Sequence, residues 1–369
     1  MIDVEGDAAR LRLRLLLGAW RSLVRKIDSQ RSRLTVATRL SYWLSGSVHS
    51  MLSFLQEKSY ADAIKNAVPF PPIFVLGFWR SGTTFLHELL CCDPRLGFPS
   101  TYACLNPSHF LLSEQWMRKR NQPPTTRPMD DLRYSWSSPQ EDEFAVLLFG
   151  APSVYEALLV PSLLRGPSAL LDLGTQPIEK RDRWVAVFTY FLRLLTVQQG
   201  KPMVLKSPAH GYRIPTLRLL FPEARYVIIE RNPYEVFASN LRLWRTLIER
   251  YSFEYCSANE IDQFVLVAYV LHEQIVTEQT RHLRGVVRVR YEKLASNPIC
   301  EMARVYEELQ LGDFEIVRRP LEKYVARVSG HVRNHFTLSH AQKNLIDTTW
   351  ARLIKGKAYT WPEASIDLQ

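Results

Sequence analysis

A glycine turn between an apolar run and a helical run is the part of the sequence best suited to chemistry. Residues 73–76 read as a buried strand, Gly77 and Gly82 enclose the turn, and residues 83–92 read as a helix. In this arrangement the backbone N–H groups of the turn and the N-terminus of the helix converge on an anion. The sequence therefore predicts a phosphate-binding loop.

The predicted loop has the glycine spacing of a Walker A loop but lacks its lysine. Thr83 follows Gly82, at the position of the lysine that neutralises the β- and γ-phosphates of a bound triphosphate. This difference favours a nucleotide donor other than ATP. A P-loop nucleotide kinase would need that lysine and a carboxylate for magnesium, so a kinase is the alternative interpretation.

Two more clusters of polar residues follow predicted strands. Lys206 ends the strand at 203–206, and Arg231 follows the strand at 226–229, with Ser239 on the next helix. An arginine and a serine at this spacing would reach one phosphate from a strand end and a helix face. We therefore expect a nucleotide with two separate phosphates, one in the glycine turn and one between Arg231 and Ser239.

Strands and helices alternate in the part of the chain that carries these residues. The predicted strands are 73–76, 203–206, 226–229 and 286–289, and the predicted helices are 83–92, 180–197, 212–221, 234–249 and 261–283. Prolines at positions 99, 107, 123, 124 and 128 predict a loop-rich stretch after the first of these helices. This alternation predicts an α/β fold, a P-loop-type parallel sheet flanked by helices. Ligands of such folds bind at the carboxyl ends of the strands, where the three clusters fall.

The predicted domain occupies residues 66–345, after a helical N-terminal extension at 1–65 and before a C-terminal tail at 346–369. The extension mixes leucine with arginine between residues 10 and 26 and contains Trp20. A basic amphipathic helix of this kind can lie on an anionic membrane surface. It can equally pack on its own domain with a solvated basic face, and both interpretations stay open.

Composition narrows the class of protein. With 46% hydrophobic residues and 9 Trp the chain can bury a large core, which excludes disorder for most of it. The net charge of +10 favours an anionic partner such as a nucleotide or an acidic lipid.

The cysteines and the apolar runs indicate the compartment. Neither a disulfide framework nor a zinc site fits the five cysteines, which are Cys91, Cys92, Cys104, Cys256 and Cys300. The longest apolar run, 146–164, is interrupted by Pro152, Glu156 and Pro161 and is not expected to span a membrane. The start of the chain is acidic, unlike a signal peptide. We expect a cytoplasmic protein, with membrane association as the open alternative.

Four motifs in this order resemble the PAPS-dependent sulfotransferases, where PAPS is 3′-phosphoadenosine 5′-phosphosulfate. The resemblance is to the bacterial branch related to the tyrosylprotein and carbohydrate enzymes, and it extends over residues 70–340. It is carried by Arg80-Ser81-Gly82-Thr83-Thr84, Lys206-Ser207-Pro208, Arg231-Asn232-Pro233 with Ser239, and Tyr291-Glu292-Lys293-Leu294. It implies a transferase that uses PAPS and no metal.

The resemblance also implies a role for each motif. Arg80, Ser81, Gly82, Thr83 and Thr84 would hold the 5′-phosphosulfate. Lys206 would contact the oxygen that bridges phosphate and sulfate, and Arg231 and Ser239 would bind the 3′-phosphate. Tyr291 would lie near the cofactor, and residues 330–336 would close over the adenosine.

The general base is not given by the motifs. Many relatives carry a glutamate shortly after the loop helix, but residues 99–103 of this chain contain no carboxylate. His210, four positions after Lys206, is one candidate. The cluster at 141–143, with Glu141, is the other. Each also has a structural explanation, because His210 would cap the next helix and Glu141 would complete a capping box with Ser138.

The acceptor stays open among a lipid, a glycan and another small alcohol or amine. Apolar and aromatic residues at 100–165, together with the basic N-terminal helix, favour a hydrophobic alcohol. The oligomeric state is open, and no nucleic-acid partner is expected. A basic protein that binds nucleotide or membrane without catalysis is a further alternative, and it would need neither Lys206 nor Arg231.

Overall fold

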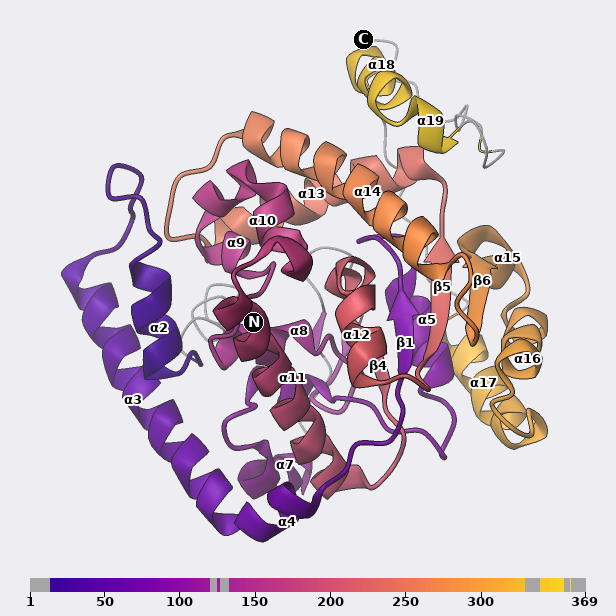
Figure 1. Cartoon of the computed structure of the whole chain (residues 1–369), viewed down its shortest axis with the longest axis horizontal. Coiled ribbons are helices and arrows are strands. Elements are labelled where there is room, and N and C mark those ends of the chain that lie inside the picture. Colours follow the sequence, from indigo (N-terminus) through magenta and orange to yellow (C-terminus); the bar gives the residue numbers. More distant parts are fainter. Residues whose placement is uncertain (1–13, 120–124, 127–132, 329–338, 355–358, 360–369) are drawn as a thin grey trace. The chain divides into compact units, whose positions relative to one another are not determined.

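The structure is a computed structural model that describes residues 14–119, 125–126, 133–328, 339–354 and 359 (Figure 1). The chain divides into two compact units. The first contains the described residues of Met1–Phe70, Phe98–Lys201 and Trp244–Ile261. The second contains those of Pro71–Gly97, Pro202–Leu243 and Asp262–Gln369, and it carries the predicted loop.

A four-stranded parallel sheet forms the centre of the second unit. Its strands are β1 (Ile73–Leu76), β4 (Val204–Lys206), β5 (Arg225–Glu230) and β6 (Val286–Arg290), in the order β4-β1-β5-β6. All three pairings are parallel. The predicted parallel α/β fold with flanking helices is confirmed, and each predicted strand differs from the observed one by at most two residues.

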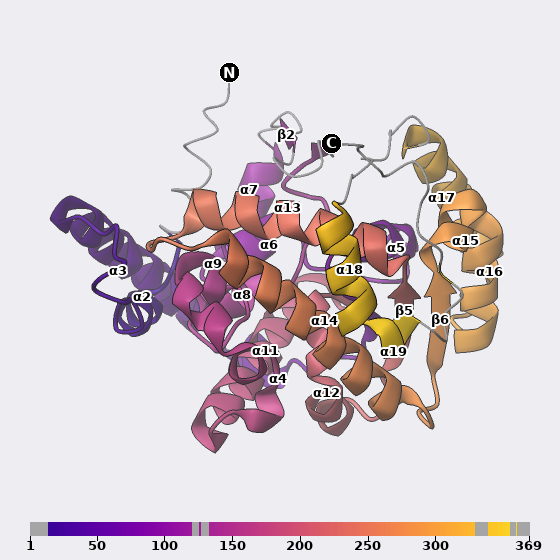
Figure 2. The ribbon, with the colours of Figure 1, turned by 90° about the horizontal axis from the view of Figure 1, so that it is seen from above.

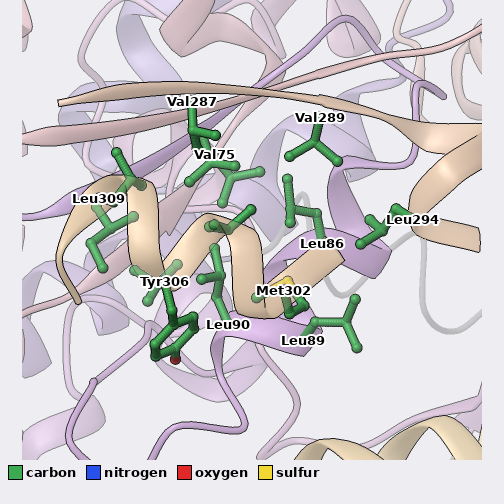
Figure 3. Close-up of a cluster of buried hydrophobic side chains, with 14 of the residues drawn as sticks. Val75, Leu86, Leu89, Leu90, Val287, Val289, Leu294, Met302, Tyr306 and Leu309 are labelled. Atoms are coloured by element: carbon green, nitrogen blue, oxygen red, sulfur yellow. The ribbon is translucent and has the colours of Figure 1, made fainter. Parts of the chain in front are cut away.

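One apolar core joins the sheet to the helix that follows the loop. Val75, Val287 and Val289 of the sheet pack against leucines of α5 (Thr83–Leu90), and α16 (Pro298–Leu309) adds Met302 and Tyr306 (Figure 3). Residues of β1 are buried throughout, whereas β6 alternates, with Arg288 and Arg290 exposed. Burial throughout is expected of a central strand, and alternating burial is expected of an edge strand. The core therefore fixes the start of α5 relative to the sheet.

The remaining helices of this unit follow the strands. They are η3 (Pro208–Tyr212), α12 (Ile214–Leu220), α15 (Tyr291–Ser296), α17 (Glu315–Val328), α18 (His340–Thr349) and α19 (Ala351–Ile354). The boundary between the units falls within α13 (Pro233–Tyr251) and within α14 (Ala258–Thr280). The buried Trp350 donates to Leu266 O at 3.1 Å and stacks on Tyr269, which fastens α18 to α14 (Figure 2).

The first unit is mainly helical. It contains α2 (Leu17–Val24), α3 (Val36–Ser59), α4 (Ala61–Asn66), α6 (Thr101–Leu105), α7 (Phe110–Lys119), α8 (Glu143–Leu148), α9 (Glu156–Leu159), η1 (Pro161–Arg165), α10 (Pro167–Leu171), η2 (Leu173–Thr175) and α11 (Ile178–Gln199), with the short strands β2 (Thr125–Thr126) and β3 (Arg133–Tyr134). Helices α6 and α7 lie in a stretch that its prolines had led us to expect as loop. The expected helix at 180–197 corresponds to α11.

The helix that the sequence left open between membrane and protein packs on protein. Trp20 and Leu23 of α2 are buried, and the Trp20 ring lies 4.8 Å from Tyr42 and 5.6 Å from Phe253. The apolar face of α2 is therefore not available to a bilayer, and residues 1–13 lie outside the described part. The domain limits 1–65, 66–345 and 346–369 stay a prediction. In the described part of the chain, no helix is both long and apolar enough to cross a membrane.

The predicted capping box at Ser138 is wrong. Helix α8 begins at Glu143 after Asp142, without a side-chain cap. The Ser138 hydroxyl accepts instead from Ser135 N at 3.0 Å, within a local turn. Short serine side chains readily bond to nearby backbone groups in this way, which removes them from capping.

Candidate active site

The glycine turn between β1 and α5 is tightly folded. A Cβ atom at Gly77 would lie 2.6 Å from Ser81 Oγ and 2.8 Å from Ile229 Cγ2, so only glycine fits there. Gly82 has φ +100° and Arg80 has φ +68°. The left-handed region costs a residue with a side chain about 1 kcal/mol or more, so Arg80 is held in a strained conformation.

The turn presents hydrogen-bond donors that are not used within the described residues. The backbone amides of Gly82, Thr83 and Thr84 have no acceptor there, and α5 has no side-chain cap. The Ser81 hydroxyl is buried and also lacks a hydrogen-bond partner in that part of the chain. Unused amides at a helix N-terminus favour an anion, which is the environment that a phosphate needs.

Lys206 brings a positive charge to this turn from the neighbouring strand. It is the last residue of β4 and pairs with Val75 of β1, so its backbone lies beside the start of the turn. The side chain is 1% exposed, and its Nζ lies 3.5 Å from Thr84 Oγ1. An ammonium group at the N-terminus of α5 supplies charge that a Walker lysine would otherwise provide.

Around Lys206, burial keeps the thiol of Cys91 neutral. Burial is the largest cause that raises the pKa of Cys91 well above its usual value, while the positive charge of Lys206 acts in the opposite direction. Because the thiolate is the nucleophilic form of cysteine, Cys91 is not suited to covalent chemistry.

Two other predicted site residues, Arg231 and Ser239, contact Arg80. Its Nε donates to Ser239 Oγ on α13 at 2.8 Å. Arg231, which follows β5, donates from Nη1 to Arg80 O at 3.2 Å. The structure therefore brings Arg80, Arg231 and Ser239 together, although they are separated by up to 159 residues along the chain.

Two further contacts orient Arg231. Its Nε and Nη2 donate to Glu235 at 2.9 and 2.5 Å, and its guanidinium lies 4.4 Å from the centre of the Tyr291 ring. A Cβ atom at Gly82 would lie 2.3 Å from Tyr291 Cδ2, so Tyr291 also covers the turn. The sequence analysis missed Glu235, although its i,i+4 spacing from Arg231 was visible.

Asn240 is a second residue that the sequence analysis missed. It is fully buried, and its Nδ2 donates to Trp79 O in the turn at 2.7 Å and to Val236 O at 2.8 Å. Asn240 therefore ties the glycine turn to α13. No sequence pattern identifies this contact, because it depends on how α13 packs on the turn.

His210 lies in η3, just beyond Lys206. Its ring is buried and meets Phe74 edge-on, with 5.3 Å between ring centres. It does not cap the next helix, because α12 follows Arg213 without a side-chain cap. Its role as general base stays a prediction.

Glu141, the other candidate base, belongs to the first unit. Its carboxylate accepts a short hydrogen bond from the Tyr155 hydroxyl. Nearby, Glu143 is fully buried and accepts from Ser153 Oγ at 2.7 Å. Residues 330–336, expected to close over the adenosine, lie outside the described residues. Among the residues whose positions are given, no three His, Cys, Asp or Glu side chains gather as metal ligands would.

Together, the parallel sheet and the amide-lined turn define an α/β protein of the P-loop type, with hydrogen-bond donors where the first strand ends that are unused within the described part of the chain. A family model described as "Sulfotransferase family" matches residues 71–315. The chain belongs to the sulfotransferase family.

Curated relatives from two mycobacteria are similar over most of the chain. A protein named omega-hydroxy-beta-dihydromenaquinone-9 sulfotransferase Stf3, from Mycobacterium tuberculosis (strain CDC 1551 / Oshkosh), is 32% identical over 329 residues. The same protein from Mycobacterium bovis has the same identity. In each case the similarity covers 86% of this chain and 83% of the relative.

Two solved structures share the fold. Sulfotransferase STF9 from Mycobacterium avium has a TM-score of 0.69 at 17% identity, covering 98% of both chains. Sulfotransferase STF1 from Mycobacterium tuberculosis H37Rv has a TM-score of 0.62 at 21% identity, covering 86% of this chain and 87% of the other.

Proposed function

We propose that this protein transfers a sulfuryl group from PAPS to a hydroxyl group of a hydrophobic, lipid-like alcohol. The observation that carries the acceptor class is the 32% identity to a sulfotransferase named for a hydroxylated menaquinone lipid. The predicted apolar acceptor agrees with it. The kinase alternative loses its support, because the chain belongs to the sulfotransferase family.

The chemistry of the glycine turn supports PAPS as the sulfuryl donor. A 5′-phosphosulfate needs hydrogen-bond donors and positive charge, and the turn offers three unused amides, the Ser81 hydroxyl and Lys206. We assign the 3′-phosphate to Arg231 and Ser239, which both form a hydrogen bond with Arg80. Arg231 keeps N–H groups beyond those shared with Glu235 and Arg80, because a guanidinium has five.

In the proposed reaction the bond between sulfur and the bridging oxygen breaks while the acceptor oxygen bonds to sulfur. Lys206 and the loop amides stabilise the negative charge that grows on the bridging oxygen. A base takes the proton of the acceptor hydroxyl. The products are adenosine 3′,5′-bisphosphate and a sulfate ester, so atoms and charge balance.

The base is assigned to either His210 or Glu141, and two variants separate them. On the acidic side of the pH profile, kcat should rise with pH because the general base must lose its proton. Replacement of the true base, as His210→Asn or Glu141→Gln, should abolish this rise, and replacement of the other residue should preserve it. A rise that survives both replacements would exclude both residues.

The acceptor is tested with PAPS and three purified alcohols: an ω-hydroxylated prenyl quinol, a hydroxylated sugar and a simple phenol. We expect mass spectrometry to show one added SO₃ group on the prenyl quinol, together with release of adenosine 3′,5′-bisphosphate. Sulfation of the sugar or the phenol alone would refute the lipid class. Phosphorylation with ATP and magnesium, without sulfation, would refute the reaction.

The donor site is tested by ligand binding without turnover. Adenosine 3′,5′-bisphosphate at about one hundred times its Kd should stabilise the protein by about 2.7 kcal/mol, seen as a higher melting temperature. Arg231→Ala should remove most of this shift, whereas Arg319→Ala, at a position away from the site, should preserve it. An unchanged shift in Arg231→Ala would contradict the 3′-phosphate assignment.

A further inference from the structure

Helix α3 of the first unit carries an exposed apolar stripe. Eight of its large apolar side chains are between 43% and 83% exposed, namely Val36, Leu40, Trp43, Leu44, Val48, Met51, Phe54 and Leu55. No Asp, Glu, Lys or Arg occurs between Leu40 and Gln56. Large contiguous apolar surfaces are rare on soluble proteins and mark sites of interaction.

The stripe lies on one side of a helix that is firmly held on the other. At 3.6 residues per turn its side chains cover roughly 140° of the helix circumference. The opposite side carries the buried Tyr42, Gly46 and Gln56. Gln56 Nε2 donates to Pro107 O at 3.0 Å and Gln56 Oε1 accepts from Leu111 N at 2.9 Å. The stripe is therefore an exposed face of an anchored helix.

Exposed arginines gather at the N-terminal end of the stripe. Leu17 N donates to Ser50 Oγ at 3.1 Å, and Trp20 contacts Tyr42, so α2 runs antiparallel beside this half of α3 (Figures 1 and 2). The arginines exposed here are Arg21, Arg25, Arg33 and Arg39. Within the described residues, Arg21, Arg25 and Arg39 form no ion pair.

The basic charge of the whole chain is concentrated in this segment. Residues 14–59 contain eight Lys and Arg against two Asp and Glu, a net charge of +6 out of the total of +10. A surface that combines apolar side chains with unpaired arginines complements a surface of anionic headgroups over hydrocarbon.

We propose that the apolar stripe and its arginine end dock on the surface of an anionic lipid bilayer. The stripe inserts Leu44, Met51 and their neighbours below the headgroups, with Trp43 at the interface. The arginines bind the lipid phosphates. The inference does not depend on the proposed acceptor, although a lipid acceptor would then be met in the membrane that the enzyme binds.

A second copy of the chain fits the stripe less well than a bilayer does. In an antiparallel pair of α3 helices, the arginine end of one copy would face Glu57 and Lys58 of the other. The Glu57 carboxylate would then be the one negative group among several arginines of the first copy and Lys58 of its own copy. This excess of like charge disfavours a dimer, whereas an anionic membrane neutralises it.

The test is sedimentation of the full chain with vesicles, without donor or acceptor. The vesicles are phosphatidylcholine with about one third phosphatidylglycerol, or phosphatidylcholine alone. We expect the wild type to bind the anionic vesicles and to bind less at about 0.5 M NaCl. The triple variant Leu40→Gln/Leu44→Gln/Met51→Gln should lose about tenfold or more in binding. Arg21→Gln/Arg25→Gln/Arg39→Gln should lose the preference for anionic vesicles.

Matched controls make the result decisive. Leu219→Gln/Ile316→Gln changes exposed apolar residues of the other unit, of which Leu219 is 84% exposed, and should bind as the wild type does. If the triple variant melts early, the single variant Leu44→Gln replaces it, with an expected loss of about threefold. Absent binding of the wild type, or equal binding of the apolar variants, would overturn the proposal. So would a dimer, seen by light scattering, that the stripe variants dissociate while no vesicle binding is found.

Discussion

Lys206 brings a lysine ammonium to a glycine turn that lacks the lysine of a Walker A loop. In a Walker A loop the lysine belongs to the loop, whereas here the charge comes from the end of β4 and meets the turn at Thr84. In the reaction that we propose, Lys206 would reach the leaving phosphate oxygen only because the sheet keeps β4 beside β1. The chemistry of this residue is therefore linked to the register of the sheet.

Replacing Lys206 should separate chemistry from binding. Because the bridging oxygen of PAPS gains its charge only as the bond to sulfur breaks, Lys206→Ala should change the Kd of PAPS little while kcat falls by about 10²–10³. Titration calorimetry and a steady-state assay measure the two quantities. The control is Lys201→Ala, at an exposed lysine that should keep both. A Kd that weakened as much as kcat would assign Lys206 to ground-state binding.

At Gly82, backbone conformation and the Tyr291 ring both exclude a side chain. Gly82→Ala should weaken binding of adenosine 3′,5′-bisphosphate, because a Cβ atom would meet Tyr291 Cδ2 at 2.3 Å and φ is +100°. In the background of Tyr291→Ala the steric part should disappear, leaving about 1 kcal/mol of conformational cost. A double-mutant cycle of Kd and stability measures the difference. Equal costs in both backgrounds would show that Tyr291 does not restrict the turn.

At the scale of elements, Asn240 connects α13 to the glycine turn. Asn240→Ala leaves Trp79 O without its donor inside the protein and should lower the free energy of unfolding by about 1–3 kcal/mol. Urea denaturation measures the loss. The exposed Asn344 provides the control, since Asn344→Ala should change stability by less than about 0.5 kcal/mol. A cost at Asn240 no larger than at Asn344 would mean that the turn holds its shape without this bond.

The elements of the second unit were predictable because their signals are local. Each strand is a short buried run next to proline, glycine or a charged residue. The four motifs that begin at Arg80, Lys206, Arg231 and Tyr291 were together enough to predict the family. Contacts across the fold were not predictable. The bond from Arg80 to Ser239 and the support by Asn240 depend on packing between distant segments.

The first unit was harder to predict from sequence. Prolines at 99–128 indicated loop, yet α6 and α7 form there, since tertiary packing outweighs local preference. The hydroxyl of Ser138 was expected to cap a helix but serves a turn. The exposure of one side of α3 could not be foreseen either, because an apolar residue in a sequence does not reveal whether another element covers it.

At the scale of the molecule, the half-buried carboxylate of Glu260 makes the stability of the first unit sensitive to acid. Burial alone would raise the pKa of Glu260, but hydrogen bonds from Arg31, Ser257 and Arg165 outweigh it and lower the pKa to about 2. The folded state therefore holds this proton less tightly than the unfolded state. The stabilisation is fully present above a pH of about 4.5 and is lost as the pH falls toward about 2.

Glu260→Gln should remove this pH dependence. We expect it to destabilise the protein by about 1–2 kcal/mol near neutral pH, because solvent screens part of the interaction, with the difference from the wild type shrinking as the pH falls below about 4.5. Urea denaturation at several pH values measures the difference. Glu223→Gln, at an exposed carboxylate, should show a small difference at every pH. A constant difference for Glu260→Gln would mean that its charge is not what stabilises the fold.

The strand order also affects how the chain folds during translation. β1 pairs with β4 and β5, which follow it by about 130 and 150 residues. On a ribosome that adds about 5–20 residues each second, the strand that leads into the glycine turn emerges roughly 7–30 seconds before its neighbours exist. During that interval a fully apolar segment must be kept from aggregating, so nascent chains of this protein are expected to engage chaperones at β1 until β5 has been translated.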